Sequence, residues 1–204
     1  LLLALIGLIS LMGMPYTVLM PVFAKNILNA GPRGLGLLGS AAGVGALLAA
    51  LRMAARRDVH GLGKWVAYAA FSFGVCLILF SLSRTFWLSA ALLVPVGFSM
   101  MIGMASSNTL IQSMVPDHLR GRAMAVFSMM FIGMAPFGAL LSGFLADAYG
   151  APTTVAVGGG ACILGAIVFR ILLPGVRDDA RRLIVAVQMA GGEPAEEVTG
   201  EGVK

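Results

Sequence analysis

The chain has 204 residues, of which 59% are hydrophobic and only 11% charged, and its formal net charge is +5. A soluble domain carries about 25% charged residues, and a soluble fold of this length leaves roughly a third of its surface in water. The composition therefore excludes an ordinary soluble domain and favours a protein embedded in lipid.

Six stretches are long and apolar enough to cross a bilayer, which takes about 20 residues per helix. In chain order they are residues 1–24, 34–54, 65–83, 86–115, 123–146 and 152–173. Each must be helical, because lipid cannot satisfy free backbone groups. A β-barrel is excluded, since its strands are short and alternate in hydropathy. The sequence predicts an all-α integral membrane bundle of six transmembrane helices.

Basic residues mark one side of the membrane. The connections at residues 25–33, 84–85 and 147–151 hold three of the fourteen Lys and Arg residues, and the other side holds eleven. Cytoplasmic connections carry the excess of Lys and Arg. We therefore expect a multi-pass protein of the plasma (inner) membrane, with both termini of this segment in the cytoplasm. The same bias explains the basic character without nucleic acid.

The composition changes at Pro174. Residues 1–173 form the predicted six-helix transmembrane half-domain, and residues 174–204 a cytoplasmic tail. Within the tail, residues 177–189 mix charged and apolar side chains, as short interfacial helices do, whereas residues 191–204 are rich in Gly and Glu, which is typical of disorder. The chain opens in apolar residues with no initiator Met and no signal peptide, so we expect it to be the later part of a longer protein.

The second and fifth stretches are rich in glycine, which suggests two three-helix units with matching roles, a 3+3 inverted repeat. Such repeats are typical of secondary transporters. Small residues also let any two membrane helices approach closely, so plain packing is the simpler interpretation. The helix-packing and gating residues that we predict are Gly39, Gly43, Gly133, Pro136, Gly138 and Gly143.

Polar side chains within the spans are few. No span has Asp or Glu at its middle, where ion pathways and proton relays place them. Tyr16 and the polar group at residues 106–112 can either bond a neighbouring helix or line a substrate cavity. The methionines can either fill gaps or form a deformable cavity. Pro15, Pro95 and Pro136 predict kinks.

Nothing in the sequence indicates an enzyme. An intramembrane serine protease needs a GxSG serine, and the residue two before Ser142 is Leu140. Cys76 and Cys162 lie alone in apolar runs, without the spacing of a metal site or a disulfide framework. We expect no catalytic residue, no bound metal and no cofactor.

The connection between the fourth and fifth spans has a distinctive sequence, residues 115–124, Val-Pro-Asp-His-Leu-Arg-Gly-Arg-Ala-Met. The residues that continue the pattern are Gly133, Pro136, Gly138, Gly143, Asp147 and Gly150. This stretch resembles the link between the tenth and eleventh helices of the major facilitator superfamily, most closely its branch of enterobactin exporters and macrolide efflux proteins. The resemblance covers essentially the whole chain as helices seven to twelve, the C-terminal half.

The resemblance implies a twelve-helix transporter that works by alternating access, whose N-terminal six-helix half is the partner of this chain. The first and fourth spans would face the central cavity, and the third and sixth would face lipid. The substrate-cavity candidates are Met12, Tyr16, Met104, Asn108 and Gln112. The candidates for a cytoplasmic conformational latch are Asp58, Asp117, Arg120, Gly121 and Arg122. Anchoring to lipid phosphates is the simpler interpretation of these charges.

We therefore expect an exporter of small amphipathic molecules or siderophores, with protons as the candidate coupling ion. Because no span holds a central carboxylate, a coupling acid would lie in the other half. Two alternatives stay open: a complete six-helix membrane protein that acts as a homodimer, and a non-transporting membrane scaffold.

Overall fold

The computed structural model describes the backbone of residues 1–55 and 61–190, and the side chains of the same residues except 117 and 174–190. Throughout this described part the regular elements are helices and no strand occurs. Contacts divide the chain into two units, Leu1–Arg170 and Ile171–Lys204. The helices are α1 (Leu2–Leu8), the π-helix η1 (Ile9–Gly13), α2 (Tyr16–Val22), the π-helix η2 (Phe23–Ile27), α3 (Gly31–Ala54), α4 (Leu62–Leu82), α5 (Phe86–Met114), α6 (Asp117–Gly133), α7 (Ala135–Tyr149) and α8 (Ala151–Ala190).

Six helical stretches of the described residues are long and apolar enough to cross a membrane: Leu2–Ile27, Gly31–Ala54, Leu62–Leu82, Phe86–Met114, His118–Tyr149 and Ala151–Leu173. The predicted all-α bundle of six transmembrane helices is thus confirmed. The observed spans extend up to five residues beyond the predicted ends, because helices continue into flanking polar residues that a search for apolar runs leaves out.

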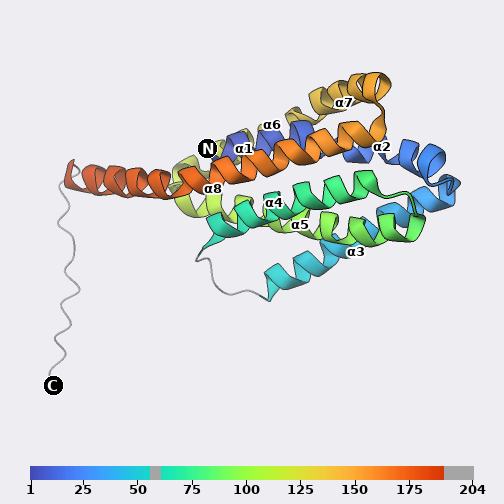
Figure 1. The fold of residues 1–204 in the computed structure, drawn as a ribbon. Helices are drawn as coiled ribbons and strands as arrows, with labels where there is room; N and C mark the ends of the chain where they lie inside the picture. Colours follow the sequence, from blue (N-terminus) through green and yellow to red (C-terminus); the bar gives the residue numbers. More distant parts are fainter. Residues whose placement is uncertain (56–60, 191–204) are drawn as a thin grey trace. The chain divides into compact units, whose positions relative to one another are not determined.

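The first span is a chain of short helical pieces, α1, η1, α2 and η2 (Figure 1). Pro15 lacks a backbone N–H and its ring clashes with the carbonyl four residues earlier. The turn before it widens, and the Met14 N–H bonds the Ile9 carbonyl five residues back at 2.9 Å. Wide turns of this kind occur often at functional sites. The irregularity predicted at Pro15 is therefore present.

The fifth span is broken once, at Met134, between α6 and α7. The cause is Pro136, which removes the N–H that would bond the Ile132 carbonyl. By contrast, α5 continues through Pro95 without interruption, and the kink predicted there stays a prediction. Helix α5 packs along both α3 and α4, and these contacts hold its backbone helical across the proline.

The last helix differs from the predicted pattern. The sixth span ends at Leu173, as predicted. The helix itself does not end there, because α8 runs unbroken to Ala190 through residues 177–189, where a separate short helix was predicted. A proline inside a helix costs one backbone bond but need not end it. Residues 171–190 belong to the second unit, and the tail predicted to be disordered, 191–204, lies outside the described residues.

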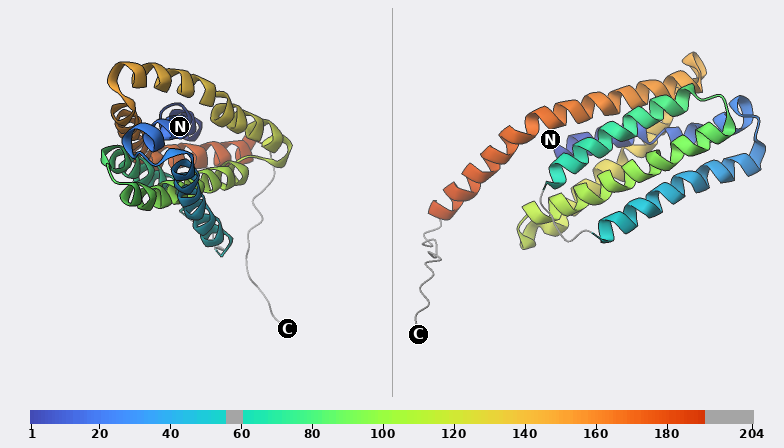
Figure 2. Two further views of the ribbon diagram at one scale, coloured as in Figure 1. Left: turned by 90° about the vertical axis from the view of Figure 1, so that its right-hand side faces the viewer. Right: turned by 60° about the horizontal axis from the view of Figure 1, so that its bottom comes forward.

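In the first unit, α4 and α5 run side by side with α3 along α5 (Figures 1 and 2). The interior is aromatic on the side where α2 and η2 meet α4. Phe23 stacks near Phe80 with ring centroids 4.7 Å apart, and Tyr16 meets Phe73 edge to face at 6.1 Å. Such pairs are favourable beyond the area they bury.

One residue makes the connection between α7 and α8. Gly150 has φ of +86°, a conformation that side chains rarely adopt and glycine adopts freely. The chain can therefore reverse direction at once, which places the start of α8 beside the end of the broken fifth span.

Candidate transport site at the two broken spans

The breaks of the first and fifth spans lie against each other. The Ser10 hydroxyl, fully buried in η1, donates a hydrogen bond to the main-chain carbonyl of Phe131 near the end of α6. A buried hydroxyl without a partner is costly, so this bond both satisfies Ser10 and fixes the two irregular segments to each other. Sequence reasoning missed Ser10, which looks like any small residue in an apolar run.

Glycines of two neighbouring helices cover the carbonyl groups of η1. A Cβ built on Gly138 of α7 would lie 2.5 Å from the Leu11 oxygen and 3.0 Å from the Ser10 oxygen, and one on Gly158 of α8 would meet the Met12 oxygen. The Leu11 carbonyl is the one that Pro15 deprives of its helical donor. Glycine at 138 brings backbone close to this carbonyl, where Cα–H groups can serve as weak donors.

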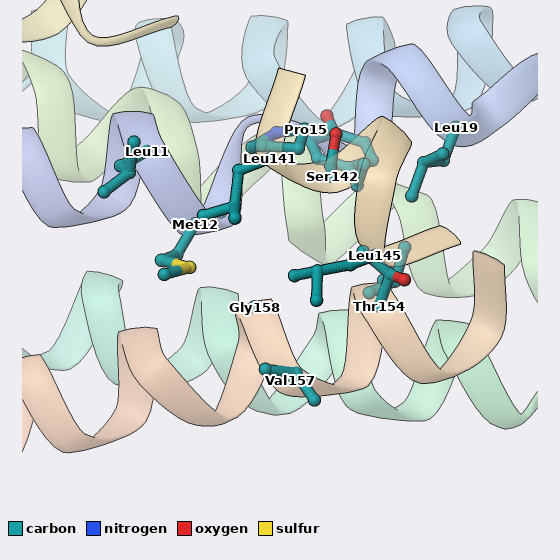
Figure 3. A pocket seen from close by; sticks show the side chains of 13 residues that line it. Leu11, Met12, Pro15, Leu19, Leu141, Ser142, Leu145, Thr154, Val157 and Gly158 are labelled. Carbon is teal, nitrogen blue, oxygen red and sulfur yellow. The ribbon is translucent and has the colours of Figure 1, made fainter. Parts of the chain in front are cut away.

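A narrow pocket lies beside this junction, between the first span, α7 and α8. Figure 3 shows Met12, Leu141 and Leu145 converging above Gly158, with Ser142 and Thr154 nearby. Both hydroxyls already donate to main-chain carbonyls, Ser142 to Ala139 of its own helix and Thr154 to Gly150 just before α8. The cavity volume is about 10 Å³, about enough for one water molecule.

Met12 and Tyr16, two of the five predicted cavity residues, both line this pocket. Tyr16 is only 4% exposed and belongs to the aromatic interior with Phe73. In this conformation its ring is a core side chain, and contact with a substrate stays a prediction.

A second, more apolar pocket lies on the other side of η1. Met104 lines it together with Ile6, Phe127, Phe131 and Ser107. Its cavity volume is about 40 Å³, whereas sites for drug-sized ligands measure about 300–1,000 Å³. Both pockets are therefore too small for an amphipathic substrate as they stand.

Asn108 and Gln112 lie one turn apart on α5, where the Gln112 amide donates to the Asn108 side-chain oxygen. Both are partly exposed, and neither lines the two pockets above. Asn108 and Gln112 therefore reach the surface of this half, whereas Ser106 and Ser107 of the same polar group are buried. Nearby, the Ser106 hydroxyl is fully buried and has no hydrogen-bond partner among the described residues.

Of the five predicted latch residues, the structure describes Arg120, Gly121 and Arg122 in full. Asp58 and the side chain of Asp117 lie outside the part of the chain that the structure describes. Arg120 and Arg122 are exposed in the first two turns of α6, and a Cβ on Gly121 would meet no described atom within 4 Å. The latch role therefore stays a prediction.

The predicted packing glycines divide into two kinds. Gly138 is tightly covered, whereas a Cβ on Gly39, Gly43 or Gly143 would meet nothing within 4 Å, and one on Gly133 meets only its neighbour Met129 at 3.8 Å. Within the described residues, besides Gly138 and Gly158, four glycines that the sequence did not single out come close to the backbone of another helix. These are Gly45 and Gly97 between α3 and α5, and Gly74 and Gly159 between α4 and α8. Packing or gating by Gly39 and Gly43 stays a prediction.

Comparison with known proteins places this architecture in a family. The sequence model of a family described as transmembrane secretion effector, within the major facilitator (MFS) group, matches residues 4–196. No curated protein matches the chain. The match spans nearly all of the 204 residues, including both broken spans. The chain belongs to the transmembrane secretion effector family of MFS transporters.

Proposed function

We propose that the chain is the C-terminal half, helices seven to twelve, of a secondary transporter that exports small amphipathic molecules or siderophores by alternating access. Its N-terminal six-helix half would be the partner across the central cavity. In this arrangement both termini of the segment lie in the cytoplasm, as the excess of Lys and Arg at that side favours.

The observation that carries this proposal is the junction at Ser10 and Phe131, where two spans lose regular helix at the same level. Irregular backbone at membrane depth is tolerated where protein buries it or where it lines an aqueous cavity. Transporters place such discontinuous helices at their substrate sites. A static scaffold has no need for two broken spans fixed to each other.

The partly exposed polar pair Asn108 and Gln112 gives the proposal its substrate surface. Amide side chains on a largely apolar wall suit molecules that combine apolar bodies with a few polar groups. The small pockets inside the half are consistent with a substrate that binds between the halves.

The test is transport by the full-length protein in everted membrane vesicles, with a panel of fluorescent amphipathic solutes and a siderophore. We expect uptake above vesicles without the protein, and its loss when a protonophore collapses the proton gradient. Uptake that survives the protonophore would reject protons as the coupling ion. Uptake equal to empty vesicles for every solute would favour the scaffold alternative.

A further inference from the structure

One end of the first unit is strongly positive. The exposed cations there are Arg52, Lys64, Arg120, Arg122 and Arg170. Asp147, the one acidic residue of this unit whose side chain is described, lies at the opposite end, in the last turn of α7. A cationic surface at the end of membrane helices attracts anionic lipid.

Two of these cations share a single site on neighbouring helices. The Arg170 guanidinium carbon lies 6.0 Å from the centre of the Tyr68 ring, within the range of a cation–π contact. Lys64 precedes Tyr68 by four residues on α4, so both lie on the same face of that helix. Among the described side chains, neither Lys64 nor Arg170 has an ionic partner.

The two helices approach closely at Gly74 and Gly159, which lie six residues after Tyr68 and eleven residues before Arg170, respectively. A Cβ on Gly74 would lie 2.5 Å from the Gly159 oxygen, and one on Gly159 would lie 2.7 Å from the Gly74 oxygen. Between this contact and the Tyr68–Arg170 pair, Phe71 and Ile167 are both exposed, at 44% and 42%. An apolar track therefore leads from the cations toward the middle of the span.

We propose that Lys64, Tyr68 and Arg170 form a binding site for the phosphate of an anionic phospholipid, whose acyl chain follows Phe71 and Ile167. The ring of Tyr68 holds the guanidinium by its face, which leaves N–H groups in the guanidinium plane for bidentate contact with phosphate oxygens. Lys64 adds a second charge, and the Tyr68 hydroxyl adds a donor at the depth where tyrosine is favoured.

A phospholipid fits these features better than a free phosphate does. The cations lie at the end of spans that lipid surrounds, and the track beside them is apolar. A soluble anion would gain nothing from Phe71 and Ile167, whereas an acyl chain buries them both.

The test is native mass spectrometry of the full-length protein in a neutral detergent, titrated with dioleoylphosphatidylglycerol or dioleoylphosphatidylcholine. The two lipids share their chains, and only the first has a net negative headgroup. We expect the wild type to retain the anionic lipid preferentially. Replacing both cations, Lys64→Gln with Arg170→Gln, should weaken its binding by about 25-fold, or about fivefold for each charge.

Arg52→Gln is the matched control, because Arg52 is an exposed cation at the same end on another helix. Arg170→Lys keeps the charge but loses the planar guanidinium that can bind phosphate through two hydrogen bonds, so we expect lipid binding between that of the wild type and that of Arg170→Gln. The proposal is overturned if the double variant binds like the wild type, if Arg52→Gln weakens binding as much as Arg170→Gln, or if millimolar inorganic phosphate displaces the lipid. None of these outcomes depends on transport, so the proposed function stands or fails separately.

Discussion

The Ser10 hydroxyl in η1 donates its hydrogen bond to the Phe131 carbonyl of α6, and so joins the first span to the fifth where both are irregular. The bond connects residues 121 positions apart in the chain. Because lipid offers no hydrogen-bond partner, the bond also satisfies a buried hydroxyl at membrane depth.

Ser10→Ala should therefore destabilise the full-length protein by about 1 kcal/mol, in the range found for hydrogen bonds between membrane helices. The measurement is the midpoint of thermal unfolding in detergent. Ser40→Ala is the matched control, because the exposed Ser40 hydroxyl bonds only the Gly36 carbonyl of its own helix. An equal effect of the two variants would show that the Ser10 bond does not hold the spans together.

Gly138→Ala should destabilise the protein by about 1–3 kcal/mol, the range for overpacking a filled interior. The new methyl group would lie 2.5 Å from the Leu11 carbonyl oxygen, which is backbone and cannot rotate away. Gly143→Ala on the same helix meets no atom within 4 Å and should be neutral or slightly stabilising. Equal thermal midpoints for the two variants would contradict the close contact.

Ser106→Ala should leave the thermal midpoint unchanged or raise it, because it removes a buried hydroxyl that has no partner among the described residues. Ser99→Ala on the same helix should lower the midpoint, since the Ser99 hydroxyl donates to Ser72 of α4 at 3.0 Å. A larger loss at Ser106 than at Ser99 would mean that the Ser106 hydroxyl has a bonding role in the intact transporter.

Asn108→Ala should reduce transport by the full-length protein by about tenfold or more, with expression and thermal midpoint near wild type. Losing an amide that bonds a polar group of a substrate costs about 1–3 kcal/mol where the partner is left unpaired. Ser113→Ala, an exposed position that bonds its own helix, is the control in the same assay. Normal transport by Asn108→Ala at normal expression would remove Asn108 from the substrate surface.

The sequence was enough to predict the six spans and the irregularities at Pro15 and Pro136, because apolar length and proline chemistry act locally. It could not predict which face of each helix packs. Faces toward lipid and faces toward protein are both apolar in a membrane bundle, so hydrophobic periodicity carries little orientation. The GxxxG pair Gly39 and Gly43 was therefore as plausible as Gly45 and Gly97, which form the observed contact.

The residues of the candidate site could likewise be predicted only where they lie on one span. Met12 and Tyr16 could be grouped because one span carries both, and Asn108 and Gln112 because one helical turn separates them. The bond from Ser10 to Phe131 depends on how the first and fifth spans cross. The close approach of Gly158 to the Met12 carbonyl likewise depends on how α8 crosses the first span. No local pattern in the chain encodes that crossing.

The most direct measurement of alternating access is the labelling rate of Ser113→Cys by a membrane-impermeant maleimide, with Cys76 and Cys162 replaced by Ala in the full-length protein. Ser113 is exposed next to Gln112, and its replacement leaves the amide pair intact. We predict that a transported solute or an imposed proton gradient changes this rate several-fold, because the substrate surface opens to one side of the membrane at a time. A labelling rate that stays the same with every solute that the vesicles accumulate would contradict the account.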